Sequence, residues 1–173
     1  AMAVESGPAA GGVAAAIAAR QVGRLDMLSV DMGGTTAKAS LIRDGQYETT
    51  PEYEVGGGAS GNRFMNGTGH PIRVPVIDLA EVSAGGGSIA YVPELTKALR
   101  VGPQSAGAVP GPVAYGKGGT LPTVTDANVV LGYLDPGFFA GGKMKLDAAA
   151  ARAAIEEHIA KPMGLSVEEA AAG

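Results

Sequence analysis

The feature that most constrains this chain is a Gly-Gly turn between two strand-like runs. The apolar run "LDMLSVDM" covers residues 25–32, and residues 37–42 alternate Ala37, Ala39 and Leu41 with Lys38, Ser40 and Ile42. A period of two is typical of a strand with two different faces. The Asp-Gly pair at 44–45 is a hairpin turn signal, and residues 46–55 follow it as a return strand. The pattern predicts a three-stranded meander.

Composition indicates one globular domain with many tight turns. The 173 residues include 28 glycines and 11 prolines, yet 46% of the residues are hydrophobic. This length suits a single domain and is short for two, so we expect one domain over residues 1–173. Because predicted helices and strands occur together, we expect an α/β fold of the α+β type with a mixed sheet.

Capping signals predict helices near both ends of the chain. Ser6 and Gly23 bracket a helix over about residues 8–22, and Thr125 or Asp126 caps a short helix that ends at Gly132. A further helix starts after Asp147 and stops before Pro162, and another starts at Ser166. Between these helices we expect extended segments at residues 71–82, 89–92 and 99–101. We also expect a loop at residues 56–70.

Charge and composition argue against several classes of partner. The formal net charge is -4 and the basic residues form no cluster, so nucleic acid is not an expected partner. The Ala-rich segment 9–19 lacks a basic start and contains two glycines, so we expect a helix there and not a membrane span or leader. The chain has no cysteine. This excludes disulfides and thiolate metal sites and favours a cytoplasmic location.

"DMGGTT" at residues 31–36 fits a hairpin that holds phosphate. Gly33 and Gly34 would let backbone N–H groups approach phosphate oxygens, and Thr35 and Thr36 would add hydroxyl donors. Asp31 could orient a hydrated divalent cation. Taken alone, the stretch fits a plain turn between two strands equally well.

"SAGGGS" at residues 83–88 strengthens the phosphate interpretation. Gly85, Gly86, Gly87 and Ser88 would suit close approach of backbone to ribose, adenine or phosphate, and the alternative is a flexible bend. Neither glycine cluster matches the Walker or dinucleotide patterns.

The remaining polar candidates carry less information. Asp126 in "TVTDAN" fits a helix N-cap, with a catalytic or metal role as the alternative. His70 and His158 lie far apart in the sequence and are weak evidence for a metal site.

Five segments in order resemble the hydantoinase A family, which includes N-methylhydantoinase, 5-oxoprolinase and subunits of acetone and acetophenone carboxylases. The resemblance covers about residues 5–172. It is carried by "ESGPAAGGV", "DMGGTTAK", "GHPIRVPVIDLAEVSAGGGSIAYV", "RVGPQSAGAVPGPVAYGKGG" and "TVTDANVVLGYL". Two positions depart from the usual pattern. Ala114 stands where relatives commonly have cysteine, and Lys38 stands where many have an acid.

The resemblance implies an RNase H-like half of an actin, sugar-kinase or chaperone-type ATPase, as the central part of a larger subunit. It implies ATP and Mg as cofactors, with Asp31 at the metal, residues 33–36 at the phosphates and residues 85–88 at the nucleoside. Asp31 and Asp126 are the catalytic candidates.

The implied activity is ATP-dependent opening of a cyclic amide ring, with a hydantoinase B-like partner and a homo-oligomer among the expected assemblies. The alternatives are a carboxylase subunit acting on a ketone, or a non-catalytic nucleotide-binding or assembly module. We expect the chain alone to be inactive.

Overall fold

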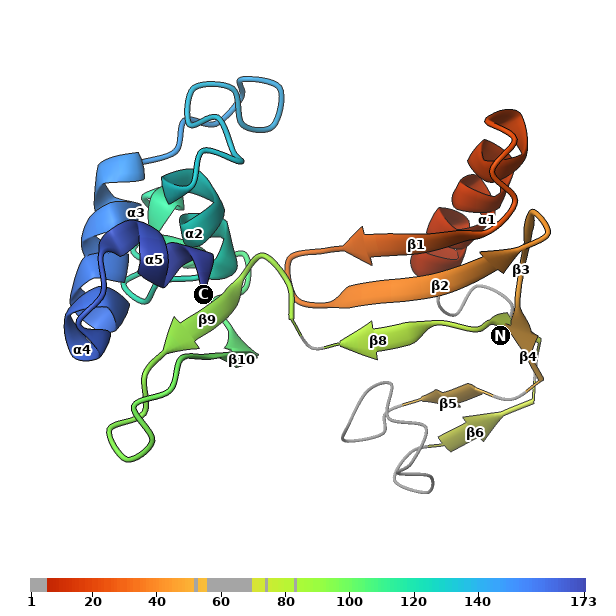
Figure 1. Ribbon diagram of the computed structural model, residues 1–173, viewed down its shortest axis with the longest axis horizontal. Coiled ribbons are helices and arrows are strands. Elements are labelled where there is room, and N and C mark those ends of the chain that lie inside the picture. The colour runs from red at the N-terminus through yellow and green to blue at the C-terminus, as the bar shows by residue number, and fades with distance from the viewer. Residues whose placement is uncertain (1–5, 52, 56–69, 74, 83) are drawn as a thin grey trace. The chain divides into compact units, whose positions relative to one another are not determined.

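The chain forms two compact units. The computed structural model describes residues 6–51, 53–55, 70–73, 75–82 and 84–173 (Figure 1). The first unit comprises residues 1–32 and 36–82, and the second comprises residues 33–35 and 83–173. The presence of helices and sheets confirms the expected combination of α and β structure. The expected mixed sheet is wrong for the described residues, because every strand pair among them is antiparallel. That both units belong to one domain stays a prediction.

In the first unit, helix α1 (Ser6–Gln21) packs against an antiparallel sheet with β2 at its centre (Figure 1). One edge of β2 pairs with β1, and the other edge pairs with β3 and β8 in turn. The predicted hairpin is therefore confirmed, whereas the return strand predicted over residues 46–55 pairs with β2 only over Gln46–Tyr47. The four strands are β1 (Met27–Met32), β2 (Ala37–Arg43), β3 (Gln46–Tyr47) and β8 (Ala80–Val82).

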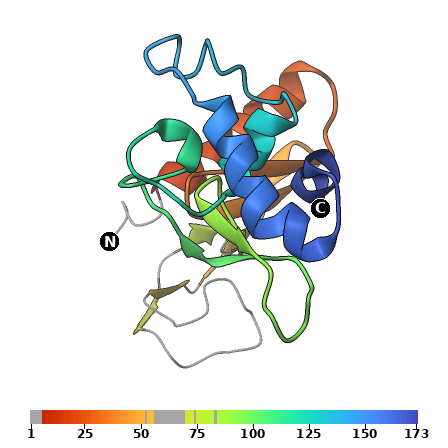
Figure 2. The ribbon, with the colours of Figure 1, turned by 90° about the vertical axis from the view of Figure 1, so that its left-hand side faces the viewer.

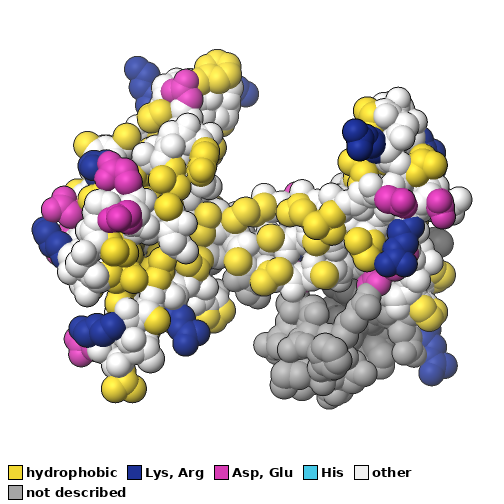
Figure 3. Space-filling view, in the orientation of Figure 1, with side chains coloured by type: hydrophobic (Ala, Val, Ile, Leu, Met, Phe, Trp, Pro, Cys, Tyr) yellow, Lys and Arg dark blue, Asp and Glu magenta, His cyan; other side chains and the backbone are white. Residues whose placement is uncertain are grey.

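The face of β2 that packs on α1 is the one with Ser40 and Ile42. Ile42 is 1% exposed and forms a small core with Ala16 and Ala19 of α1. Leu41, on the opposite face, is 44% exposed. Figure 3 shows apolar side chains along this outer face of the β1–β2 hairpin. The turn after β2 has positive φ at both Asp44 and Gly45, as its sequence predicts.

The return from β3 to β8 is broken into short antiparallel pairs. β4 (Thr49–Thr50) pairs with β7 (Val76–Ile77), and β5 (Tyr53–Val55) pairs with β6 (His70–Ile72). The extended segment predicted at residues 71–82 is confirmed in these pieces. The predicted loop lies outside the described residues, except for its last residue, His70, which begins β6.

The second unit joins a β-hairpin to a group of helices. β9 (Ser88–Tyr91) pairs with β10 (Arg100–Ser105), close to the predicted strands. A 3-10 turn, η1 (Val113–Tyr115), precedes α2 (Val124–Val130). Figure 2 shows the long helix that follows, with α5 beside it. The long helix consists of α3 (Ala148–Ile155), the π-helical η2 (Glu156–Ala160) and α4 (Lys161–Met163), and α5 (Val167–Ala172) follows it in the chain.

The long helix corrects the expected stop before Pro162. A π turn over residues 156–160 shifts the hydrogen-bond register, and the Lys161 N–H donates to the Glu156 carbonyl. Pro162 then falls in the first turn of α4, where a missing N–H is tolerated. The helix ends at Gly164, which has φ of 68°. The predicted starts after Asp147 and Ser166 are confirmed by side-chain caps.

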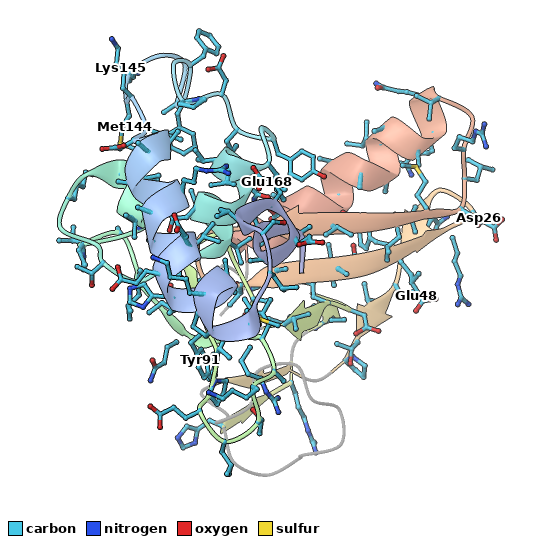
Figure 4. The ribbon with its side chains drawn as sticks, turned by 60° about the vertical axis from the view of Figure 1, so that its left-hand side comes forward. Asp26, Glu48, Tyr91, Met144, Lys145 and Glu168 are labelled. Carbon is cyan, nitrogen blue, oxygen red and sulfur yellow. The ribbon has the colours of Figure 1, made fainter. Side chains whose placement is uncertain are left out.

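Two apolar clusters fill the second unit. One centres on Ala114, Val129, Leu146 and Ala151, and the other on Ile155, Ile159, Ala160 and Ala170. Arg152 Nη2 lies 2.7 Å from Glu168 Oε1 and links α3 to α5, where Figure 4 labels Glu168. None of the helices formed by the described residues combines the length and apolar character needed to cross a bilayer.

Candidate functional site

Two glycine-rich turns, far apart in the sequence, lie backbone against backbone in the second unit. The Gly86 N–H donates to the Gly33 carbonyl at 2.9 Å, and the Gly87 N–H donates to the Gly34 carbonyl at 2.6 Å. The structure thus brings together the two clusters that the sequence singles out.

The glycines of the second turn are required by this close approach. A Cβ on Gly85 would lie 2.5 Å from the backbone N and C of Thr35. A Cβ on Gly86 would lie 2.9 Å from Thr125 Oγ1, and one on Gly87 would lie 2.9 Å from the Gly34 carbonyl oxygen. At Gly85 and Gly87 these contacts include backbone, which would have to move, whereas at Gly86 the contact is with the Thr125 side chain. Residues 85–87 therefore form a support on which turn 33–35 rests.

The amides of residues 85–88 are already engaged within the protein. Besides the two bonds to turn 33–35, the Gly85 N–H donates to Ser88 Oγ at 2.8 Å. The Ser88 N–H donates back to the Gly85 carbonyl at 3.0 Å. Contact between residues 85–88 and a ligand stays a prediction, and it would have to use atoms other than these amides.

Turn 33–35 presents the opposite situation. Its three residues are exposed, and no hydrogen bond between described residues is donated by their N–H groups. A Cβ on Gly34 would meet nothing within 4 Å. The carbonyls of Gly33 and Gly34 hold the turn to its support, while the amides and the space around Gly34 stay open. This arrangement can receive an anion.

Asp31 and Thr36 flank this turn in the sequence and belong to the first unit. Asp31 is exposed on β1, and a Cβ on Gly11 of α1 would lie 3.5 Å from its Oδ2. Thr36 is partly buried just before β2. Lys38, the position that departs from the family pattern, lies with its Nζ 3.7 Å from Oε2 of Glu81 on β8.

Asp126 is buried and bonded to four donors in this geometry, and its expected catalytic role stays a prediction. It is 0% exposed, and its carboxylate accepts from Val113 N–H, Ala114 N–H, and both the N–H and Oγ1 of Thr123. Thr123, not Thr125 or Asp126, is the N-cap of α2, and Asp126 is the third residue of its capping box. The carboxylate joins η1 to α2.

Sequence reasoning missed Thr125 as part of the site. Its Oγ1 donates to the Gly86 carbonyl at 2.8 Å. The spacing Thr123-x-x-Asp126 is a capping-box signal, and it places Thr125 in the first turn of the helix. The contact with Gly86 depends on tertiary structure, which no local pattern encodes.

The described residues hold no group of three or more metal-ligating side chains. His70 lies on β6 of the first unit and His158 lies in η2 of the second.

Comparison with known proteins identifies the family. The hydantoinase/oxoprolinase family model matches residues 1–173, and the chain belongs to this family. An uncharacterised protein of Methanocaldococcus jannaschii is 53% identical over 170 residues, which cover 98% of this chain and 25% of that protein. The caprolactamase subunit alpha of Pseudomonas jessenii is 43% identical, over 99% of this chain and 23% of the subunit. The chain spans about a quarter of the length of these relatives.

Two solved structures share the fold. The crystal structure of the ATP-dependent caprolactamase from Pseudomonas jessenii matches 97% of this chain and 22% of its own, with a TM-score of 0.73 and 43% identity. The second is a nucleotide-free structure of acetone carboxylase, from work on the mechanism of ATP-dependent acetone carboxylation. It matches 94% of this chain and 21% of its own, with a TM-score of 0.73 and 32% identity.

Proposed function

We propose that this chain is the nucleotide-binding part of an ATP-dependent enzyme that opens cyclic amide rings. The observation that carries the proposal is turn 33–35, whose carbonyls at Gly33 and Gly34 are bonded to the support while its amides donate to no acceptor among the described residues. Backbone N–H groups without acceptors bind phosphate oxygens in many proteins. The family description and the ATP dependence of the caprolactamase support the same reading.

In this proposal the residues of the chain position the phosphates of ATP. The amides of Gly33, Gly34 and Thr35 would donate to phosphate oxygens, and the Thr35 and Thr36 hydroxyls would add donors. Asp31 would orient Mg²⁺ through water, because a single carboxylate with phosphates and waters is a common ligand set. ATP would supply the phosphoryl group that activates an otherwise inert amide oxygen, and fixed donors would stabilise the developing charge.

The wider setting of the site is part of the proposal. We infer an RNase H-like half of an actin or sugar-kinase type ATPase, with the remaining phosphate contacts supplied by other parts of the full-length protein and a hydantoinase B-like partner beside it. The term "subunit alpha" in the name of the caprolactamase relative supports a multi-subunit assembly. The expected location is cytoplasmic.

A carboxylase is the second candidate, because acetone carboxylase matches this chain with the same TM-score as caprolactamase. The two candidates differ in which co-substrate accelerates ATP hydrolysis. A lactam alone should accelerate it in a ring-opening enzyme, whereas a carboxylase needs a ketone together with bicarbonate.

The test is titration calorimetry with Mg-ATP on the full-length protein and on this chain. We expect the full-length protein to bind, and Gly34→Ala to weaken binding about tenfold, equivalent to roughly 1.4 kcal/mol. A methyl group there enters the open space of the turn without touching the protein. Binding by full-length protein that is indifferent to Gly34→Ala and to Asp31→Asn would overturn the proposed site. Binding without turnover of any lactam or ketone would favour a non-catalytic module.

A further inference from the structure

The carbonyl oxygen of Gly86 is the point where helix α2 meets the support of turn 33–35. Thr125 donates to this oxygen twice, through its N–H at 2.8 Å and through its Oγ1 at 2.8 Å. Thr125 is 7% exposed, so water competes little for either bond. The Thr125 hydroxyl therefore donates its hydrogen bond to the backbone of the glycine run.

The peptide group that joins Gly86 to Gly87 passes this contact on to turn 33–35. Its carbonyl end accepts from Thr125, and its N–H end, on Gly87, donates to the Gly34 carbonyl at 2.6 Å. Because a trans peptide is planar, its C=O and N–H point in opposite directions and turn together. Thr125 on one side and Gly34 on the other thus hold one rigid plane.

A run of three glycines needs such a clamp. Glycine rotates more freely than any other residue, so the 86–87 peptide has little intrinsic preference for this orientation. Thr125 itself is held firmly, since it lies within the capping box formed by Thr123 and the fully buried Asp126. The buried start of α2 thus holds Thr125, Thr125 holds the 86–87 peptide, and that peptide holds Gly34.

We propose that Thr125 is a positioning residue for turn 33–35. Its hydroxyl, together with its N–H, fixes the orientation of the 86–87 peptide and, through it, the direction in which the amides of the turn point. The effect on ligand binding rests on the proposed function, whereas the effect on the backbone does not.

Two substitutions separate the hydroxyl from the shape of the side chain. Thr125→Val keeps the branched shape and removes the donor, and Thr125→Ser keeps the donor. In the full-length protein we expect Thr125→Val to speed exchange of the Gly87 amide roughly tenfold and to weaken Mg-ATP binding about tenfold. Thr125→Ser should stay within about twofold of wild type in both measurements. Residue-resolved hydrogen exchange and calorimetry give the two readouts.

Ile159→Val is the matched control, because Ile159 is 2% exposed in a core cluster with no part in the glycine turns. It should lower the melting temperature without changing Gly87 exchange or Mg-ATP affinity. Wild-type exchange at Gly87 in Thr125→Val, or equal effects of Ile159→Val, would overturn the positioning role. If wild type does not bind Mg-ATP, the proposed function fails, and the exchange data still decide the role of Thr125.

Discussion

At the scale of single residues, glycine serves two different purposes in this chain. Gly85 and Gly87 lie against backbone and Gly86 lies against the Thr125 hydroxyl, whereas Gly34 faces open space. The first group builds the support of the turn and the second leaves room for a ligand. The same residue type therefore predicts opposite results on substitution.

Gly85→Ala should destabilise the second unit, because its Cβ would lie 2.5 Å from the Thr35 backbone. We expect a loss of about 1–3 kcal/mol in the free energy of unfolding, typical of overpacking. The loss is measured by urea denaturation of the full-length protein, with hydrogen exchange of the amides at residues 33–35 as the probe. Gly34→Ala is the control and should leave stability close to wild type. Equal stability of the two variants would contradict the packing described for Gly85.

Asp126→Asn tests the structural role of the buried carboxylate. The amide nitrogen of Asn would face backbone N–H groups that now donate to a carboxylate oxygen. We expect a loss of about 3 kcal/mol in the free energy of unfolding, the scale for donors left unsatisfied in the interior. A catalytic role predicts the reverse, with turnover abolished and the denaturation midpoint unchanged.

The residue patterns explain how much of the site could be predicted from sequence. "DMGGTT" and "SAGGGS" are local signals, so both clusters could be found by their glycines. What the amides of residues 85–88 bind depends on backbone brought from elsewhere in the chain, which no local spacing records. Asp126 shows the same limit, since two of its four donors, the N–H groups of Val113 and Ala114, are identified only by folding, and the other two require Thr123 to be recognised as the cap.

At the scale of elements, alternation predicted β2 but not which of its faces is buried. Both faces carry apolar residues, and the small residues of α1 select the Ser40 and Ile42 face. The stop expected before Pro162 failed for a related reason, because the π turn of η2 accommodates the proline in a helix that tertiary packing prolongs.

A pair of substitutions on β2 tests this assignment of faces. Ile42→Ala should cost about 2–5 kcal/mol of stability, because it empties a buried position. Leu41→Ala, at its 44% exposed neighbour, should cost less than about 1 kcal/mol. Thermal denaturation of each variant measures both. A larger cost at Leu41 than at Ile42 would show that the faces are reversed.

The capping box of α5 predicts a pH effect. The Ser166 hydroxyl, and then its N–H, donate to Glu169 and hold the pKa of that carboxyl below its ordinary value. A lowered pKa in the folded protein means that the cap stabilises α5 above the pKa of the unfolded chain. This stabilisation is lost as the pH falls through the lower, folded pKa.

Ser166→Ala should therefore raise the pKa of Glu169 toward its ordinary value. Carboxyl NMR titration of wild type and variant measures the change. Glu168, whose pKa is lowered first by the hydrogen bond from Arg152, should titrate as in wild type and serves as the internal control. An unchanged pKa of Glu169 in Ser166→Ala would show that Ser166 is not what lowers it.

At the scale of the whole molecule, the chain combines a first unit with the β1–β2 hairpin and a second unit with turn 33–35 and its support. The chain spans about a quarter of the length of these relatives, so those proteins contain further sequence beyond the matched region. What the chain itself contributes to the proposed activity is an anion-binding turn of defined orientation.

Hydrogen exchange of the full-length protein with and without Mg-ATP tests that contribution most directly. The account predicts that Mg-ATP slows exchange of the amides of Gly33, Gly34 and Thr35, because phosphate oxygens become their acceptors. The amides of Gly86 and Gly87, already bonded within the protein, should change little. Binding of Mg-ATP that leaves the amides of residues 33–35 exchanging at their ligand-free rates would contradict the account.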